Sequence, residues 1–431
     1  MNASVPALLV SAVASGQGKT TVTAALARHA ARQGRRVRVF KTGPDFIDPM
    51  ILARACGQPV GQLDLWMGGA AHCRDLLHQA ACEADLLLVE GVMGLYDGDP
   101  SSADLAVQFN LPVLAVIDAG AMAQTFGALA LGLHAYRPEL ALYGVLANRV
   151  GGAGHAAMLA QSLTATAAGI RFLGAIPRDA ALAIPERHLG LVQADDIADL
   201  DARLDRAAAA IGESLTFEEI PRVEFSGESL PEPPPLLAGL KIAVAQDAAF
   251  SFIYPANLTL LRAMGATIVA FSPLRDPAVP SADALYLPGG YPELHAAALA
   301  ANRPLLESLR HYVRSGRPLL AECGGMMPLF EQLTDLEGRS HAMAGVLPGQ
   351  IHMHQRLQAL ALQSVAFPQG ELRGHSFHYS SLSSPLSPCW HGCTQHGGRG
   401  EAVFRVGALT VSYVHFYWPS NPRAAAALFR P

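Results

Sequence analysis

Short apolar runs recur along the first half of the chain, and several of them are apolar at every position rather than at alternate ones. They are ALLVSAV (7–13), VRVF (37–40), DLLLVEG (85–91), LPVLAVID (111–118), LYGVLAN (142–148) and IRFLGAIP (170–177). Strands of this kind are covered on both faces, as in parallel sheets that carry helices on either side. Because alanine-rich helical patterns separate the runs, the first half predicts a doubly wound α/β domain.

A proline-rich segment divides the chain. Residues 221–239 read PRVEFSGESLPEPPPLLAG, which is typical of a semi-rigid linker. Strand patterns resume after it in KIAVAQD, ATIVAFSP, ALYLPGG and RPLLAEC. The chain has 431 residues, too many for one ordinary core. We therefore expect a first domain over 1–225, a linker over 226–239 and a second α/β domain over 240–431.

Composition excludes several classes of protein. Charged residues are 16% and hydrophobic residues 51% of the chain, which excludes a disordered protein. The net charge of −5, with scattered Lys and Arg, predicts no nucleic-acid partner. One stretch between Asp118 and Arg137 is uncharged, but it contains Gln124, Thr125 and His134. It therefore predicts a buried helix pair or a long core helix rather than a membrane span.

The cysteines and the start of the chain indicate the compartment. Six cysteines are too few for a disulfide scaffold and suit a reducing environment. The first apolar run leads directly into a glycine-rich motif, and cleavage of this region as a signal peptide would destroy that motif. We therefore expect a cytoplasmic protein with no membrane partner. The sequence leaves the oligomeric state open, a homodimer included.

The glycine-rich motif SAVASGQGKTT (11–21) lies between a predicted strand and a predicted helix. Its glycines let backbone N–H groups face phosphate oxygens, Lys19 can reach the terminal phosphates, and the Thr20 hydroxyl can hold Mg²⁺. Val13 stands where a strict phosphate loop has glycine, and Ala14 stands where the partition ATPases have a signature lysine. The alternative interpretation is a glycine-rich turn that binds no nucleotide. The predicted ATP-binding residues are Ser15, Gly16, Gln17, Gly18, Lys19, Thr20, Thr21 and Asn148.

Acidic residues follow the later strands of this half. Asp45 and Asp48 lie in KTGPDFIDP, Glu90 ends a strand, and Asp97 lies in a glycine-rich loop. In open α/β sheets the ligand crevice lies beyond the carboxyl ends of the strands, so these side chains should converge on the phosphates. Asn148 ends another strand, where it is either a contact for an adenine edge or a turn residue. The predicted Mg²⁺ ligands are Thr20, Asp45, Glu90 and Asp97.

The second half carries a pattern typical of a cysteine nucleophile. RPLLAECGGMMPLFEQL predicts a buried strand, a sharp turn at Cys323 and a helix, whose N-terminus would lower the pKa of the thiol. Gly289 and Gly290 end an earlier strand and could form an oxyanion hole, and His415 is a candidate base. The alternative is a small core cysteine with an aromatic neighbour.

These features together resemble the class I glutamine amidotransferases. Joined to the phosphate loop, KTGPDFIDP, EGVMGLYDG and PERHLGL (185–191), the whole chain resembles the cobyrinic acid a,c-diamide synthases of cobalamin biosynthesis. Two positions depart from the patterns. Tyr417 stands where most class I enzymes have a glutamate, which implies a Cys–His dyad, and Ser376 replaces the glutamate of the family's GHEFHYS segment.

The resemblance implies a dethiobiotin synthetase-like P-loop domain followed by a class I amidotransferase domain. It also implies ATP and Mg²⁺ as cofactors and L-glutamine as the ammonia donor. It implies that Cys323 attacks the glutamine amide, that His415 relays protons and that ammonia stays in the protein. ATP would activate the a and c acetate carboxylates of cobyrinic or hydrogenobyrinic acid as acyl phosphates, which ammonia converts to amides. The implied contacts to this corrinoid substrate are Phe46, Ile47, Asp48, His378 and Tyr379.

Other readings keep part of this pattern. The same chemistry would suit another acceptor, as in a nickel sirohydrochlorin a,c-diamide synthase, a cobyric acid synthase or a nucleotide-amidating synthetase. A nucleotide switch of the partition ATPase type would use the first half alone. The cluster CWHGCTQH has soft ligands close together, and we interpret it as a surface loop, with a zinc site as the alternative. Its candidate ligands are Cys389, His391, Cys393 and His396.

Overall fold

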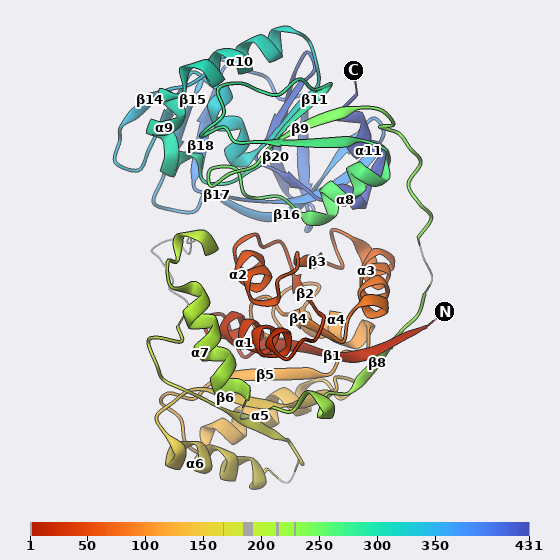
Figure 1. Ribbon diagram of the computed structural model, residues 1–431, viewed down its shortest axis with the longest axis vertical. Helices are drawn as coiled ribbons and strands as arrows, with labels where there is room; N and C mark the ends of the chain where they lie inside the picture. The colour runs from red at the N-terminus through yellow and green to blue at the C-terminus, as the bar shows by residue number, and fades with distance from the viewer. Residues whose placement is uncertain (1, 167, 184–192, 213–214, 228–229, 431) are drawn as a thin grey trace. The chain divides into compact units, whose positions relative to one another are not determined.

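The computed structural model describes residues 2–166, 168–183, 193–212, 215–227 and 230–430. It divides into two compact units, Met1–Leu230 and Pro231–Pro431, each of which is described by itself (Figure 1). The PERHLGL segment at 185–191 lies outside the described residues. Among the described residues, no helix is both long and apolar enough to cross a membrane.

The first unit is built on a parallel sheet in the order β3-β2-β4-β1-β5-β6-β7, as the apolar runs predict. A short strand near residue 222, which the sequence did not reveal, pairs antiparallel with β1. The strands are β1 (Ala3–Ala12), β2 (Val37–Thr42), β3 (Gly61–Leu63), β4 (Leu86–Glu90), β5 (Val113–Asp118), β6 (Leu142–Val150), β7 (Phe172–Pro177) and β8 (Arg222–Phe225).

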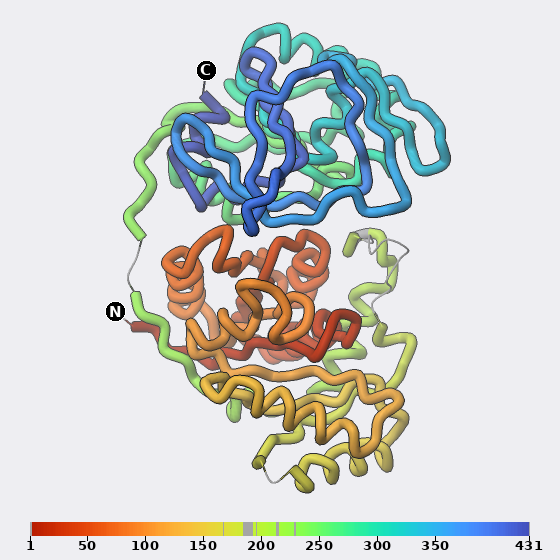
Figure 2. The backbone as a smooth tube through the Cα atoms, turned by 180° about the vertical axis from the view of Figure 1, so that it is seen from behind, coloured from red at the N-terminus to blue at the C-terminus, as the bar shows by residue number. Residues whose placement is uncertain are grey.

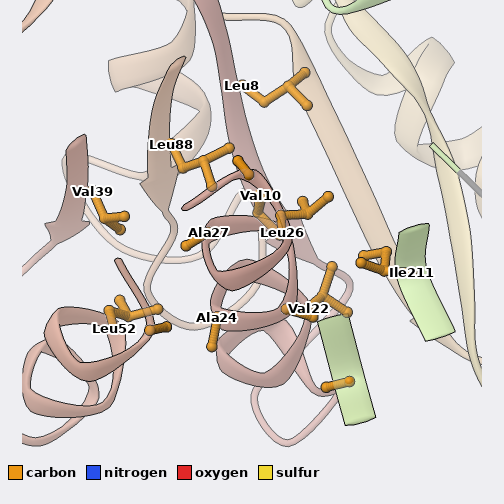
Figure 3. Packing of buried hydrophobic residues seen from close by; sticks show 14 of the residues in the cluster. Leu8, Val10, Val22, Ala24, Leu26, Ala27, Val39, Leu52, Leu88 and Ile211 are labelled. Carbon is orange, nitrogen blue, oxygen red and sulfur yellow. The ribbon is translucent and has the colours of Figure 1, made fainter. Parts of the chain in front are cut away.

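Helices cover both faces of this sheet, which explains why β1 is apolar at every residue. Leu8 and Val10 face one core with α1, α2 and α7, while Ala7 and Leu9 face the other core with α3 to α6. Figure 3 shows the first core, where α1 packs against the strands. The helices are α1 (Lys19–Arg32), α2 (Ile47–Cys56), α3 (Gly69–Glu83), α4 (Ser102–Gln108), α5 (Thr125–Tyr136), α6 (Ala153–Thr164), η1 (Ala194–Asp196), α7 (Leu200–Gly212) and η2 (Phe217–Glu219).

The uncharged stretch after Asp118 differs from its prediction. It forms a loop and one helix of 12 residues, α5, rather than a helix pair or a long core helix. Phe126 and Ala130 of α5 are buried, whereas Leu131 and Tyr136 are exposed. The stretch is therefore a surface helix with one buried side, and its lack of charge does not mark full burial.

The second unit contains a larger mixed sheet, in the order β10-β9-β11-β12-β21-β20-β19-β16-β17-β22. Its first five strands are parallel, and the remaining strands pair antiparallel, in the part of the chain that Figure 2 draws in blue. A smaller sheet has the order β14-β13-β15-β18. The strands are β9 (Lys241–Ala245), β10 (Thr267–Phe271), β11 (Ala284–Leu287), β12 (Leu319–Glu322), β13 (Gln332–Thr334), β14 (Ser340–Ala342), β15 (Gln350–Met353), β16 (Ala359–Phe367), β17 (Gly370–His378), β18 (Ser380–Ser383), β19 (Trp390–Thr394), β20 (Arg399–Val406), β21 (Leu409–Ser412) and β22 (His415–Phe416).

The helix predicted after Cys323 is shorter and tighter than expected. It is a 3₁₀ helix, η4, that contains Pro328, and the chain then enters β13. Pro328 has no N–H to continue a helical ladder, so an α-helix cannot run through this segment undisturbed. The helices of this unit are α8 (Pro255–Ala263), η3 (Pro292–His295), α9 (Ala296–Ala301), α10 (Arg303–Arg314), η4 (Cys323–Leu329), η5 (Trp418–Ser420) and α11 (Pro422–Ala427).

Candidate functional site

The phosphate loop joins β1 to α1 in the first unit. Gly16 and Gly18 adopt φ of 75° and 93°, a left-handed conformation that favours glycine. A Cβ on Gly18 would also overlap Asn148, whose Nδ2 donates to the carbonyl of Gln17 at 2.8 Å. Asn148 thus fixes the loop at the N-terminus of α1, where backbone N–H groups can face an anion.

The other predicted ATP contacts lie on or beside this loop. Ser15 is exposed at its tip, and Thr21 is half-buried in the first turn of α1. Asn148 contacts the loop from β6 through its Nδ2 group. Its Oδ1 accepts a hydrogen bond from the Arg149 N–H at 2.9 Å, which orients the side chain. Contact between Asn148 and adenine stays a prediction.

Lys19 folds back over the loop. Its Nζ donates to the carbonyl oxygens of Ala14 at 3.1 Å and Met93 at 2.5 Å. Burial, and after it the positive charge of Lys41, lower the pKa of Lys19. A buried ammonium that contacts only neutral carbonyls, next to N–H groups of a helix N-terminus, is arranged to meet an anionic ligand.

Five side chains converge behind the loop. Glu90 Oε1 accepts hydrogen bonds from Thr20 Oγ1 at 2.8 Å and from Lys41 Nζ at 2.6 Å. Lys41 Nζ also contacts Asp48 Oδ2 at 2.6 Å and Asp45 Oδ2 at 3.6 Å. The carboxyl ends of β2 and β4 meet here because these strands are neighbours in the sheet. Lys41 is the central cation of this cluster, and the sequence analysis gave it no role.

Burial governs the ionisation of this cluster. It raises the pKa of Glu90 to about 7 and that of Asp45 to about 6, with the charge of Asp48 acting in the same direction. Burial also raises the pKa of Asp48, but Lys41 outweighs it and leaves the net shift downward. Burial lowers the pKa of Lys41, yet Glu90 and Asp48 hold it above its usual range. The cluster therefore keeps its cation charged in a buried place.

The oxygen donors at this place fit Mg²⁺, which prefers oxygen ligands and keeps several waters. Thr20 and Glu90 are adjacent, and Oε2 of Glu90 accepts no hydrogen bond from the described residues. Asp97 is exposed, and its Oδ2 accepts from the Gly94 N–H at 3.0 Å, so no described contact joins it to Glu90. The described residues hold no group of three or more His, Cys, Asp or Glu side chains suited to a metal. Thr20 and Glu90 would thus be the protein ligands of the ion, and phosphate and water would complete its coordination.

The elbow in the second unit places Cys323 at φ 47°, a strained value for a residue other than glycine. It follows β12 directly and opens η4. A Cβ on Gly324 would lie 2.8 Å from the Gly290 carbonyl oxygen and 3.2 Å from its nitrogen, so the elbow packs on the PGG turn. Such strain at the end of a buried strand is typical of a nucleophile elbow.

His415 lies against the same turn. A Cβ on Gly289 would overlap the His415 ring, so this position has room only for glycine. The thiol of Cys323 donates to the carbonyl of Phe377 in β17 at 3.9 Å. His415, in β22, is paired with His375 of the same strand β17. The structure therefore brings the four predicted residues of the glutaminase site around one turn.

The predicted lowering of the Cys323 pKa is wrong for this structure. Burial raises the pKa of the thiol, and the charges of Glu293, Glu401 and Glu322 raise it further, against one backbone hydrogen bond. Burial likewise lowers the pKa of His415, with His375 acting in the same direction. The resting pair is thus a neutral thiol and a neutral imidazole, because a short 3₁₀ helix offsets little of the cost of burying a charge.

The residues predicted to contact the ring substrate lie in both units. Phe46 and Ile47 lie at the start of α2, beside the acidic cluster. His378 is buried near the elbow, and its ring nitrogens bond to the Ser380 carbonyl at 2.8 Å and to Glu401 at 3.2 Å. Its ring stacks on Tyr413, with ring centroids 3.7 Å apart. Tyr379 next to it is half-buried. Contact of these residues with a substrate stays a prediction.

The Cys389–His396 cluster is a strand rather than the loop we predicted. Trp390–Thr394 form β19, with Cys389 just before it and His396 in the turn after it. Cys389 and Cys393 are exposed, and Arg399 bonds to His391 Nε2 at 2.5 Å. In the described part of the chain these side chains form no metal-binding group.

Glu322 is a functional candidate that sequence reasoning missed. Its Oε2 accepts from the Tyr286 hydroxyl at 2.8 Å, and its Oε1 accepts from the Phe416 N–H at 3.3 Å. Glu322 directly precedes Cys323 and Phe416 directly follows His415, so this hydrogen bond links the two segments that carry the predicted catalytic pair. Burial raises the pKa of Glu322 to about 8, so the side chain is mostly neutral at pH 7. The only signal in the sequence is an acid inside the apolar strand RPLLAEC.

We expect Glu322→Gln to remove a pH dependence of stability. A carboxyl whose folded pKa lies above its ordinary 4.5 binds its proton more tightly when folded. The free energy of unfolding then falls as the pH rises from 4.5 toward about 8, by up to about 1.4 kcal/mol per pH unit. Urea unfolding of both proteins at about pH 5 and about pH 8 measures the difference. An equal loss of stability in both proteins would contradict it.

The family comparisons cover both units. A family model described as the CobQ/CobB/MinD/ParA nucleotide binding domain matches residues 8–192. A second, described as the CobB/CobQ-like glutamine amidotransferase domain, matches residues 241–422. The phosphate loop and the cysteine elbow thus fall in domains of these two kinds.

Curated relatives extend over nearly the whole chain. The hydrogenobyrinate a,c-diamide synthase of Stutzerimonas stutzeri is 60% identical over 99% of this chain and 99% of its own. That of Pseudomonas aeruginosa is 57% identical over 99% and 98%. The cobyrinate a,c-diamide synthase of Herminiimonas arsenicoxydans is 50% identical over 98% and 96%. The chain therefore belongs to the family of hydrogenobyrinate and cobyrinate a,c-diamide synthases, ATP-dependent ligases that form amides with glutamine as the donor.

Proposed function

We propose that this chain amidates the a and c acetate carboxylates of cobyrinic or hydrogenobyrinic acid, with ATP as activator and glutamine as the source of ammonia. The observation that carries the proposal is the strained elbow at Cys323, packed with His415 around the Gly289–Gly290 turn, in a chain that also has an open phosphate loop. The names of the relatives support the choice of substrate.

Cys323 and His415 would hydrolyse glutamine. Because both groups rest in their neutral forms, the imidazole of His415 can take the thiol proton as sulfur attacks the amide carbon. The Gly290 N–H lies beside the elbow and would donate to the oxyanion that develops. His415 would then return the proton to the leaving ammonia, and water would release glutamate from the thioester.

The first unit would activate the acceptor. A carboxylate is a poor acyl donor, and transfer of the terminal phosphate of ATP to it creates a good leaving group. Lys19 and the loop N–H groups would hold the phosphates and offset the charge that develops. Mg²⁺, when bound, would neutralise phosphate charge, and Thr20 and Glu90 would hold it. Ammonia would then displace phosphate from the acyl carbon.

The acidic cluster would position the segment that meets the ring substrate. Asp45 and Asp48 are fixed by Lys41, and the backbone N–H groups of Ile47 and Asp48 donate to Asp45 Oδ1. These contacts would hold the start of α2, with Phe46 and Ile47, beside the phosphate loop. We assign Asp45 and Asp97 to acyl-phosphate chemistry, and Phe46, Ile47 and Asp48 to the ring substrate.

We expect two carboxyl-to-amide conversions when the purified chain receives ATP, Mg²⁺, glutamine and either cobyrinic or hydrogenobyrinic acid. Mass spectrometry of the product gives the number of amides, and parallel incubations with other tetrapyrrole acids test the acceptor. Conversion of nickel sirohydrochlorin alone would reject the proposed substrate but keep the chemistry. ATP hydrolysis stimulated by membranes or DNA, with no amide product, would favour a nucleotide switch instead.

A further inference from the structure

Three carboxylates surround the nucleophile of the second unit. When ionised, Glu293, Glu401 and Glu322 all act on Cys323 and disfavour its thiolate. Negative charge beside a cysteine nucleophile opposes its reaction, so the acids need a reason other than activation of the thiol.

Two of the three acids have partners inside the protein. Glu322 accepts from Tyr286 and from the Phe416 N–H, and Glu401 accepts from His378 Nε2 at 3.2 Å. Glu293 differs, because its Oε2 is buried and has no hydrogen-bond partner among the described residues. A buried carboxylate oxygen without a partner costs free energy that the fold must otherwise supply.

Glu293 lies in the segment that packs against the Cys323 elbow. It belongs to η3, which follows the Gly289–Gly290 turn directly. Its neighbour Pro292 packs against the elbow, since a Cβ on Gly324 would lie 2.8 Å from Pro292 Cδ. The charge of Glu293 also raises the pKa of Tyr413. The carboxylate is therefore close enough to Cys323 for its charge to act on the thiol.

In the described part of the chain, no cationic side chain forms an ion pair with Glu293. Burial raises the pKa of Glu293 to about 7, and no Lys, Arg or His opposes this shift. Glutamine carries such a cation, its α-ammonium group, at the opposite end of the molecule from the amide that reacts. Three N–H donors on that group suit a carboxylate without a partner.

We propose that Glu293 binds the α-ammonium group of glutamine while the amide lies at Cys323. This inference rests on the proposed glutaminase function of Cys323. It makes Glu293 a specificity-determining residue, because only an amide with a charged amino group neutralises it. Binding would also remove a negative charge from the surroundings of Cys323, so that the thiolate becomes more accessible once glutamine is present.

The test uses Glu293→Gln in the full chain, with glutamine and with glutaramate, which is glutamine without its α-amino group. We expect kcat/KM for ammonia release from glutamine to fall by about 10- to 100-fold, mainly through KM, because one charge-assisted contact is lost. The much slower hydrolysis of glutaramate should change by less than about threefold, since it never made that contact. Glu293→Asp, which keeps the charge, should recover part of the loss.

Two controls separate the possible failures. Glu337→Gln makes the same change at an exposed acid of the same unit and should behave as the unchanged protein. Ammonium-dependent amidation should survive in Glu293→Gln, which shows that the chain is folded. Equal losses with glutamine and glutaramate, or no loss with glutamine, would overturn the role of Glu293. If the unchanged protein released no ammonia from glutamine, the proposed function itself would fall, whatever Glu293 does.

Discussion

Replacement of Cys323 by alanine should abolish glutamine-dependent amidation while amidation with free ammonium survives. The sulfur is the only atom that can form the thioester, so ammonia release from glutamine should fall by roughly a thousandfold or more. Ammonium salts at high concentration supply ammonia directly, and the phosphate loop lies in a separate compact unit. Product amides formed with glutamine and with ammonium are measured side by side.

A matched cysteine makes this result specific. Cys393 is a free, exposed thiol in the same unit, and Cys393→Ala should keep both activities. Because a Cβ is already present in both residues, neither variant adds bulk, and the φ of 47° at position 323 suits alanine no worse than cysteine. Undiminished glutamine-dependent turnover in Cys323→Ala would show that the elbow is not the glutaminase site.

The parts of the fold that the sequence predicted are those with local signals. Strands such as β1 and β4 are apolar at every residue because two cores cover them, and that pattern is visible in one segment alone. The antiparallel strands β16 and β17 gave no such signal, since ALALQSVAF and GELRGHSFH mix polar and apolar residues. Their pairing depends on partners far along the chain, which one segment cannot reveal.

The functional site also divides into residues with a local sequence signal and residues without one. The loop before Lys19 and the elbow at Cys323 have glycines at fixed offsets, so a short segment predicts each of them. Glu293 gave no signal and Glu322 only that of an acid in an apolar strand, because their importance comes from what folding places beside them. The thiol pKa was mispredicted for a related reason: burial, which only the fold determines, outweighs the local effect of the turn.

Lys19→Met should abolish amidation with glutamine and with ammonium alike. The chain has only three lysines, at 19, 41 and 241, and two of them lie at the phosphate loop, while Arg provides nearly all other positive charge. Without the Lys19 ammonium, the charge that develops on the transferred phosphate loses its main protein cation, and we expect a loss of roughly a thousandfold or more. Lys19→Arg should fail as well, because the planar guanidinium cannot take the same place.

The exposed lysine provides the control for this experiment. Lys241→Met, at the exposed start of β9, should keep full activity. Ammonia release from glutamine should persist in Lys19→Met, since Cys323 and His415 lie in the other unit. The two variants are therefore opposite: Cys323→Ala loses the ammonia source and keeps the ligase, and Lys19→Met does the reverse. Retained ammonium-dependent amidation in Lys19→Met would mean that the loop does not hold the ATP that activates the acceptor.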